Sequence, residues 1–234
     1  MSTKKLPETD EERIDILRIT VEQEEINEAW DKILSIIELQ ELRLFITGYE
    51  KAYLALNQSI IDRDKAMNLY NDLFKNAQLY ISHFIQVLFL AVIRGEIKAE
   101  NLVLYGFQEN DLVLPDLSTE KAVLRWGENL IYAESGRISR GGISLYNPTI
   151  AKVKVHYELF KESIHSLSIY EKTLSRLQSN AENIRKKADD FILKIWAKVE
   201  ERYSGTSSAE QALRFQVYKI QFYHSKGEQL SVFD

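Results

Sequence analysis

Two long rows of apolar positions dominate the pattern of this chain. The first row advances by alternating steps of four and three residues from Leu42 to Ala91, and Arg63 is its one charged member. The surrounding stretch, residues 35–94, contains no proline and one glycine, Gly48. This spacing predicts one long helix with a continuous buried seam. We expect Arg63 to pair with an acidic residue on the opposing helix.

A second apolar row of similar length runs from Ile150 to Tyr203 without glycine or proline. The pair Asn147-Pro148 predicts where this helix begins, because asparagine accepts from free backbone amides and proline suits the first helical position. Since a turning segment separates the two rows, the simplest arrangement packs them as an antiparallel pair. Aromatic residues at many seam positions favour a bundle thicker than a two-stranded coiled coil.

Shorter elements flank the two long helices. Thr9 and Glu12 stand at the spacing of a capping box, which predicts a helix over residues 10–25. The connection that follows is expected to pack Trp30 against the bundle. After the two rows, residues 207–213 are compatible with one more short helix.

The segment between the long helices differs from them in composition. Residues 95–148 hold eight of the twelve glycines and prolines of the chain, so the polypeptide turns there. Residues 101–115 contain two short apolar runs that favour irregular or extended backbone. Asp116 or Ser118 is expected to cap a shorter helix. A loop is expected over residues 136–146.

The C-terminal tail alternates apolar and polar residues between Tyr218 and Val232. Period-two alternation around a turn favours a small β-hairpin or an extended tail. Pairing with residues 102–104 or 112–114 would bury the apolar side chains of both segments.

These patterns together predict an all-α protein. The predicted fold is an elongated up-and-down helical bundle built on two long antiparallel helices, with a small C-terminal β-hairpin as a further element. The predicted organisation is a single elongated domain over residues 1–234, with long helices at 35–94 and 148–203, an irregular connection at 95–147 that includes a shorter helix, and a tail at 204–234.

The charges nearly balance, with 30 basic and 35 acidic residues and a formal net charge of −5. Such a balance does not predict a nucleic-acid binder. The absence of cysteine excludes disulfides, thiolate metal ligands and a cysteine nucleophile. The polar N-terminal segment lacks the apolar core of a signal peptide, so we expect a cytoplasmic protein.

The most apolar window, residues 77–93, contains Gln78, Ser82, His83 and Gln86. A membrane-spanning helix needs about 20 residues without such polar groups at its centre. We therefore predict a helix that is buried on most sides and no membrane association.

Polar residues near one end of the bundle form the candidate ligand or partner site. His83 lies in the most apolar part of the first long helix. A buried histidine with one hydrogen bond is the ordinary interpretation, and a ligand or partner contact is the alternative. We expect Gln86, Arg94, Glu96 and Trp126 to complete a polar pocket at that end.

Signals for metal binding or catalysis are weaker. Four-helix bundles hold paired metal ions with two Glu-x-x-His pairs. This chain has one such spacing, Glu162 to His165, and His165 is expected to point away from the seam. The loop around Arg137 and Arg140 lacks the fixed offsets of a phosphate-binding loop. We predict no catalytic residues, no metal ligands and no cofactor.

Three hypotheses for the function follow. The leading one is a non-catalytic helical interaction or structural protein that presents long helix surfaces to a protein partner or to another copy of itself. The alternative is a small-molecule or metal-binding helical bundle, including an enzymatic one, with its site near His83. The third is association with RNA or a ribonucleoprotein through the basic run at residues 185–187.

Three segments resemble an uncharacterised family of bacterial all-helical proteins of similar length. They are residues 80–88 (YISHFIQVL), 93–96 (IRGE) and 146–150 (YNPTI). The similarity extends over most of the chain. The resemblance implies an up-and-down helical bundle, and it implies no activity, cofactor or functional residue.

Overall fold

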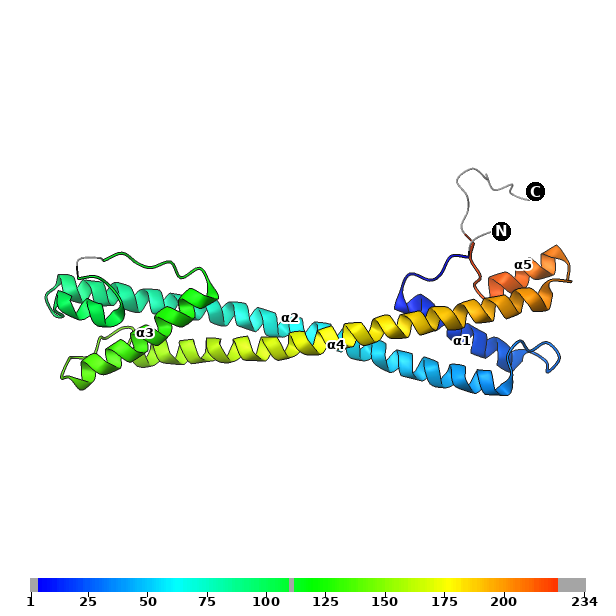
Figure 1. Cartoon of the computed structure of the whole chain (residues 1–234), viewed down its shortest axis with the longest axis horizontal. Coiled ribbons are helices and arrows are strands. Elements are labelled where there is room, and N and C mark those ends of the chain that lie inside the picture. Colours follow the sequence, from blue (N-terminus) through cyan, green and yellow to red (C-terminus); the bar gives the residue numbers. More distant parts are fainter. Residues whose placement is uncertain (1–3, 110–111, 223–234) are drawn as a thin grey trace, which may run out of the picture. The chain divides into compact units, whose positions relative to one another are not determined.

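The computed structural model describes residues 4–109 and 112–222 of the chain (Figure 1). These residues form helices α1 (Asp10–Ile26), α2 (Ile36–Ile93), α3 (Glu120–Ser139), α4 (Ile150–Tyr203) and α5 (Ser208–Val217), and the 3₁₀ helix η1 (Ala99–Tyr105). Within these two ranges there is no β-strand, only an isolated antiparallel bridge between Lys4 and Phe222. The predicted all-α class is confirmed.

The helices belong to two compact units. Unit 1 comprises the residues up to Ser59 and those from Leu174 onward, and unit 2 comprises residues 60–173. Helices α2 and α4 each contribute one part to unit 1 and one part to unit 2. The sequence predicted that the whole chain forms a single elongated domain. That prediction depends on how the two units are arranged, and it stays a prediction.

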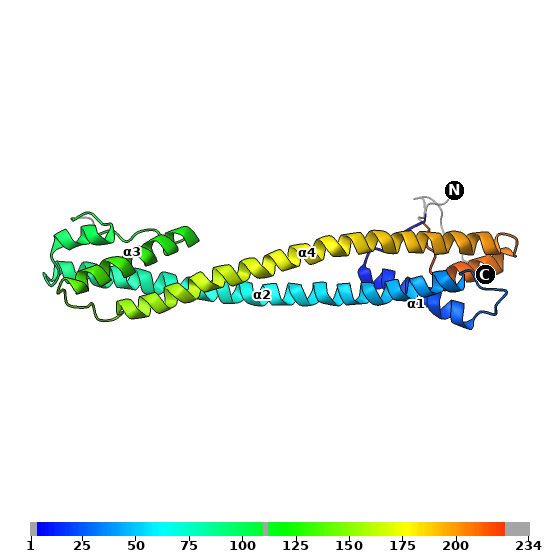
Figure 2. The ribbon, with the colours of Figure 1, turned by 60° about the horizontal axis from the view of Figure 1, so that its bottom comes forward.

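Unit 1 packs α1 and α5 against the adjoining parts of α2 and α4 (Figures 1 and 2). Its buried core includes Trp196, whose indole N–H donates to a backbone carbonyl at 3.0 Å. The rings of Phe45 and Phe191 lie 4.8 Å apart, and Lys198 donates to Glu38 at 2.6 Å. Because earlier residues of α2 meet later residues of α4, the two helices run antiparallel within this unit.

Ion pairs connect the different elements of unit 1. They include pairs whose partners are more than a hundred residues apart in the sequence. These pairs are Lys4–Glu200 (2.7 Å), Arg13–Asp189 (2.8 Å), Arg185–Asp10 (2.6 Å), Lys198–Glu38 (2.6 Å) and Arg214–Asp31 (3.0 Å).

Unit 2 packs α3 and η1 against the adjoining parts of α2 and α4 (Figure 2). The rings of Phe74 and Phe160 lie 5.4 Å apart, and Tyr80 stacks on His156 at 3.8 Å. The two helices therefore run antiparallel in this unit as well. Helix α3 begins beside Tyr70, whose hydroxyl donates to Glu120 at 2.8 Å.

The boundaries of α1 and α2 follow from local chemistry. The Thr9–Glu12 capping box is present, because each side chain accepts from the other residue's backbone amide. The predicted end of the first long helix is confirmed, since α2 ends at Ile93 and Gly95 has a φ of 73°. The left-handed glycine allows the amide of Glu96 to donate back to the carbonyl of Ala91 at 2.9 Å.

The start of α3 differs from the prediction. Thr119 is the N-cap, and its side chain accepts from the amide of Ala122 at 3.2 Å. Asp116 and Ser118 instead bond to each other in the preceding turn, where the Ser118 amide donates to the Asp116 carboxylate at 2.8 Å. Helix α3 continues to Ser139, so the loop predicted to begin at residue 136 begins four residues too early.

Gly127 in the middle of α3 has a packing role. A Cβ at this position would lie 2.4 Å from the Tyr157 ring and 3.1 Å from the Ile81 side chain. Glycine weakens an isolated helix, but here it lets α3 approach both long helices closely. This close approach was not predicted from the sequence.

Helix α4 begins two residues later than the pair Asn147-Pro148 predicts. Asn147 has a φ of 70°, which is incompatible with the extended backbone of an N-cap. Thr149 takes the capping role, because its hydroxyl accepts from the amide of Lys152 at 3.4 Å. The helix itself starts at Ile150.

The connection between the long helices is more helical than predicted. Leu102 and Tyr105, expected in irregular or extended backbone, lie in η1 and are fully buried. Gly106 ends η1 with a φ of 87°. The second apolar run, residues 112–114, lies in irregular backbone with exposed side chains.

The predicted tail pairing is wrong within the described residues. Residues 221 and 222 meet the N-terminal segment, where the Lys5 amide donates to the Gln221 carbonyl at 2.8 Å. The predicted hairpin turn near residue 226 and its second arm lie outside the described residues. Two side-chain expectations also fail: Trp30 is 73% exposed, and Arg63 pairs with the adjacent Asp64 (3.3 Å).

Candidate interaction surface

The predicted site residues of α2 lie on its exposed side. His83 and Gln86 are both exposed, whereas Ile81, Phe84 and Ile85 are fully buried. Neighbouring residues in a helix are about 100° apart, so His83 points away from the core that its neighbours enter. The expectation of a buried His83 is therefore wrong.

The other three predicted site residues form contacts with side chains close to them. Arg94 and Glu96 are exposed and pair with each other at 2.6 Å. Trp126 is buried and stacks on Phe107 at 4.7 Å, and its indole N–H has no hydrogen-bond partner. His83 and Gln86 face solvent while Trp126 faces the core, so no common polar pocket is seen here. A role in partner binding for the exposed residues stays a prediction.

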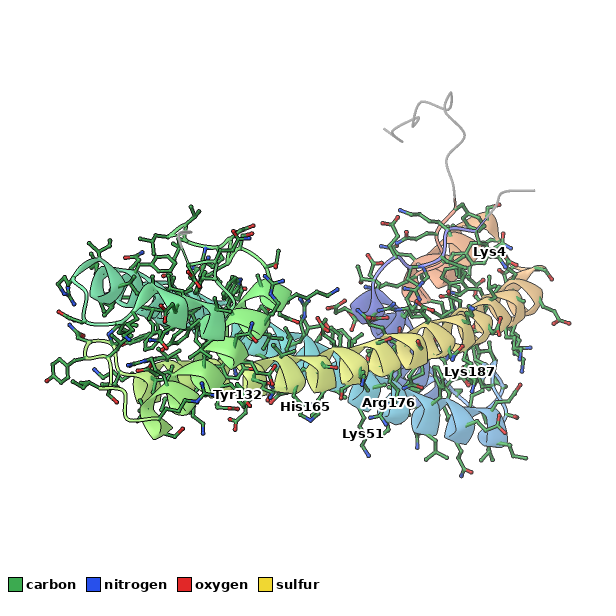
Figure 3. All side chains as sticks on the ribbon, turned by 60° about the vertical axis from the view of Figure 1, so that its left-hand side comes forward. Lys4, Lys51, Tyr132, His165, Arg176 and Lys187 are labelled. Carbon is green, nitrogen blue, oxygen red and sulfur yellow. The ribbon has the colours of Figure 1, made fainter. Side chains whose placement is uncertain are left out.

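Metal-ligand chemistry has no assembled site in the described part of the chain. No group of three or more His, Asp or Glu side chains lies close enough there to hold an ion. Glu162 and His165 are both exposed on α4, and His165 points into solvent (Figure 3).

The basic run at residues 185–187 is partly occupied within unit 1. Arg185 binds the Asp10 carboxylate through two nitrogens, at 2.7 and 2.6 Å. Lys186 and Lys187 are exposed. Figure 3 shows Lys187 and Arg176 projecting from α4 as separate side chains.

A groove lies between α2 and α4 in unit 2. Its volume is about 420 Å³. Small side chains, Ala66, Ser163 and Ser166, lie between the larger ones, and the Ser163 hydroxyl donates to the carbonyl of Phe160 at 2.6 Å. The groove is lined by Asp62, Lys65, Ala66, Leu69, Leu73, Leu159, Glu162, Ser163, Ser166 and Tyr170.

The apolar side chains of this groove are open to solvent. Leu69 is 57% exposed, Leu159 is 42% exposed and Tyr170 is 41% exposed. No residue of α2 from Ile60 to Asn76 is buried, although this segment contains seam positions such as Met67. On the facing part of α4, by contrast, Phe160, Ser163 and Leu167 are buried.

Unit 2 also exposes most of the large apolar side chains that the described residues leave open to solvent. Exposed apolar side chains that lie together mark interaction sites in soluble proteins, and the groove brings Leu69, Leu159 and Tyr170 together. The residues in unit 2 are Ile61, Leu69, Leu79, Leu90, Ile93, Val103, Leu104, Leu112, Val113, Leu114, Tyr132, Ile143, Tyr146, Val155, Leu159, Ile169 and Tyr170.

Helix α2 passes a length and composition test for a membrane span. Its most apolar 18-residue window has a mean hydropathy of 1.5, and 39% of that window is buried inside the protein. The core helix of a soluble protein passes the same test, so this property does not distinguish a membrane from a protein partner.

A buried ionic network holds the far part of α3. Arg137 binds the Glu134 carboxylate through two nitrogens, at 2.9 and 2.8 Å, and the Tyr105 hydroxyl donates to the same carboxylate. The backbone amide of Leu145 adds a fourth donor at 3.2 Å, and Arg137 also donates to the carbonyl of Ile143 at 2.6 Å. The network therefore joins η1, α3 and the segment before α4.

Burial and hydrogen bonding act in opposite directions on this carboxylate. Burial alone raises the pKa of Glu134. The hydrogen bonds from Arg137, Tyr105 and the Leu145 amide together lower this pKa by more than burial raises it. The net pKa lies below the ordinary glutamate value, so Glu134 stays charged beside Arg137. Since its oxygens are already occupied by donors, the network fits a structural role.

Comparison with protein-family models, with curated proteins and with solved structures finds no match for this chain. The resemblance to an uncharacterised bacterial helical family stays a prediction.

The sequence did not single out the groove or the network. The groove residues Leu69 and Leu159 lie off the two seam rows, and apolar residues off a seam are the signal that such a surface leaves. Glu134 and Arg137 stand three residues apart, a spacing that brings their side chains together on a helix. Their burial depends on η1, which the sequence pattern did not predict.

Proposed function

We propose that this protein is a non-catalytic helical interaction or structural protein that binds a protein partner or another copy of itself. The observation that carries the proposal is the concentration of exposed apolar side chains in unit 2. Burying such side chains is favourable by about 25 cal/mol per Å². A partner that covers these side chains would bury apolar surface that the fold of the chain leaves exposed.

The proposed architecture is an elongated up-and-down bundle on two long antiparallel helices. It is supported by the 58 residues of α2 and the 54 residues of α4. It is also supported by the antiparallel contacts within each unit. Small-angle scattering tests this part of the proposal, because a compact particle in solution would contradict it.

The interaction proposal is tested by affinity purification of tagged variants from the native cell. The variants Leu69→Glu and Leu90→Glu change exposed leucines of α2 in unit 2. The control Leu54→Glu changes an exposed leucine of the same helix in unit 1, and the three side chains are 57%, 49% and 65% exposed.

At least one unit 2 variant should lose the partner recovered with the wild type, while Leu54→Glu retains it. Circular dichroism should be unchanged in all three variants, because the substituted side chains are exposed. Equal recovery of the same partner by all three variants would contradict the proposal.

A further inference from the structure

Unit 1 contains a small cavity with a volume of about 210 Å³. Its walls come from residues 5–8, from α1, from Trp196 of α4 and from residues 219–221, which follow α5 (Figure 1). Pockets for drug-sized ligands measure about 300–1,000 Å³, so this cavity suits a smaller molecule.

Hydrogen bonds join the walls of the cavity to one another. The Lys5 amide donates to the Gln221 carbonyl at 2.8 Å, which ties the N-terminal segment to the segment after α5. The Trp196 indole N–H donates to the Tyr218 carbonyl at 3.0 Å, which ties the same segment to α4. Because both bonds are made within the folded chain, a ligand meets walls that are already in place.

One part of the cavity lining is apolar. Leu6 and Pro7 line the cavity and are partly exposed, so a ligand can contact them. Ile16 and Trp196 also line the cavity, but they are buried in the core of unit 1. Such a lining favours a ligand that has an apolar part.

Most of the charged side chains around the cavity already have partners. Lys5 pairs with Glu8 at 3.0 Å. The Glu12 carboxylate accepts from the backbone amides of Glu8 at 2.7 Å and Thr9 at 3.1 Å. These three side chains are therefore occupied within the chain.

The other two charged side chains of the lining are Asp15 on α1 and Lys219 after α5. Among the described residues, neither side chain makes a hydrogen bond or an ion pair. Because they do not pair with each other, a ligand can lie between them. The cavity thus presents one open carboxylate and one open ammonium group, which complement a ligand that carries one charge of each sign.

The backbone at Lys219 is an independent observation. Its φ is 53°, in the left-handed region that favours glycine. The amides of Lys219 and Ile220 donate to the carbonyls of Gln216 at 3.1 Å and Phe215 at 2.8 Å, an arrangement in which glycine usually ends a helix. A larger residue held in such a conformation points to a function of its side chain, and this side chain lines the cavity.

We propose that the cavity binds a free α-amino acid with an apolar side chain. The ammonium group of the ligand pairs with Asp15, its carboxylate pairs with Lys219, and its side chain contacts Leu6 and Pro7. Asp15 and Lys219 are exposed, so water weakens both ion pairs and binding is reversible and weak. The cavity belongs to unit 1 and the proposed interaction surface belongs to unit 2, so neither proposal depends on the other.

The first test titrates the full chain with L-leucine and follows the indole N–H resonances of its tryptophans by NMR. Trp196 reports on the cavity, because its indole N–H donates to Tyr218, the residue before Lys219. Its resonance should shift saturably, whereas the resonances of Trp30 and Trp126, which do not line the cavity, should not shift. The variants Trp30→Phe and Trp126→Phe assign the resonances.

Two analogues separate the charges of the ligand. Isocaproate lacks the ammonium group of leucine, isoamylamine lacks its carboxylate, and both keep the branched apolar chain. Each analogue should bind several-fold more weakly than L-leucine, because each leaves one charge of the cavity without a partner.

Two substitutions assign the charges of the cavity. Asp15→Asn should weaken L-leucine binding several-fold and leave isocaproate binding unchanged. Lys219→Gly should weaken L-leucine binding likewise and leave isoamylamine binding unchanged, and glycine suits the backbone at this position. Glu22→Gln is the control and should bind L-leucine as the wild type does, because Glu22 is an exposed carboxylate about two turns further along α1, outside the cavity.

A Trp196 resonance that does not shift saturably with L-leucine would overturn the inference. So would isocaproate or isoamylamine that binds as tightly as L-leucine, or equal binding of L-leucine by Lys219→Gly and Glu22→Gln. None of these results affects the partner recovered with Leu69→Glu, so the proposed function is tested separately.

Discussion

Units 1 and 2 use the same two helices but are held together by different interactions. In unit 1, ion pairs such as Arg13–Asp189 and Arg214–Asp31 join separate elements. In unit 2, ion pairs such as Arg94–Glu96 and Arg137–Glu134 join residues that are close together in the sequence. Among the described residues, unit 2 also leaves more large apolar side chains exposed than unit 1 does. The difference shows that the elements packed on an apolar seam decide which of its side chains stay exposed.

The largest expected effect is on the buried network of unit 2. Glu134→Ala should reduce the stability of unit 2 by about 3–5 kcal/mol, because it leaves the Arg137 guanidinium buried without its counter-charge. Hydrogen exchange should accelerate in α3 and η1 and change little in α1. Glu96→Ala, which removes the exposed partner of Arg94, is the control and should have no measurable effect. Equal acceleration in both units would contradict the assignment of this network to unit 2.

The next effect concerns the close approach at Gly127. Gly127→Ala should destabilise unit 2 by about 1–3 kcal/mol, because the added methyl group overlaps the Tyr157 ring. Gly48→Ala is the matched control in unit 1, where a Cβ meets nothing within 4 Å. That change should stabilise its helix by about 0.5–1 kcal/mol. Thermal melts of both variants check the opposite signs, and equal signs would refute the packing argument.

A smaller loss of stability is expected from a substitution in unit 1. Asp10→Asn removes the charge that binds Arg185 and accepts from Tyr49 at 2.6 Å. Hydrogen bonds to charged groups contribute about 1.5–3 kcal/mol each, and the asparagine retains part of them. We expect a loss of about 1–2 kcal/mol, measured by denaturant unfolding, with exchange accelerating in α1 before α3. Faster exchange in α3 would contradict the assignment.

Acid should produce the smallest and most gradual effect, and in unit 1 it should act through Glu38 and Asp10. The hydrogen bond from Lys198 lowers the pKa of Glu38 from 4.5 to about 2. Arg185 likewise lowers the pKa of Asp10. A carboxyl group whose folded pKa is depressed contributes its full stability above the unfolded pKa and loses it as the pH falls. For Glu38 this loss falls between about pH 4.5 and about 2.

Tryptophan fluorescence can follow this acid transition. In a Trp30→Phe, Trp126→Phe variant, the buried Trp196 of unit 1 is the remaining indole. Thermal melts recorded through Trp196 should shift to lower temperature over this pH range, and Lys198→Ala should reduce the shift. A shift of equal size in both proteins would show that the Glu38 pair does not contribute.

The sequence predicted those features that local chemistry determines. The Thr9–Glu12 capping box and the glycine stop at Gly95 depend on a few neighbouring residues, and both were confirmed. The helix start at Asn147 was wrong because its backbone takes a positive φ, which a local capping preference cannot reveal.

Long-range pairing lay beyond sequence reasoning. Arg185 and Asp10 are separated by 175 positions, and the sequence pattern placed Arg185 only within the basic run at residues 185–187. His83 appeared buried because its neighbours are apolar, yet its position on the helix directs it to solvent. To predict the groove, one must know that α3 and η1 cover α2 from Ala77 onward and leave Leu69 exposed.

The central claim, that unit 2 carries the interaction surface, is tested most directly by hydrogen exchange with and without the partner. For self-association the comparison is between concentrated and dilute protein. The account predicts added protection along residues 60–76 of α2 and 158–173 of α4, with α1 and α5 unchanged. Protection confined to α1, α5 and the parts of α2 and α4 in unit 1 would contradict it.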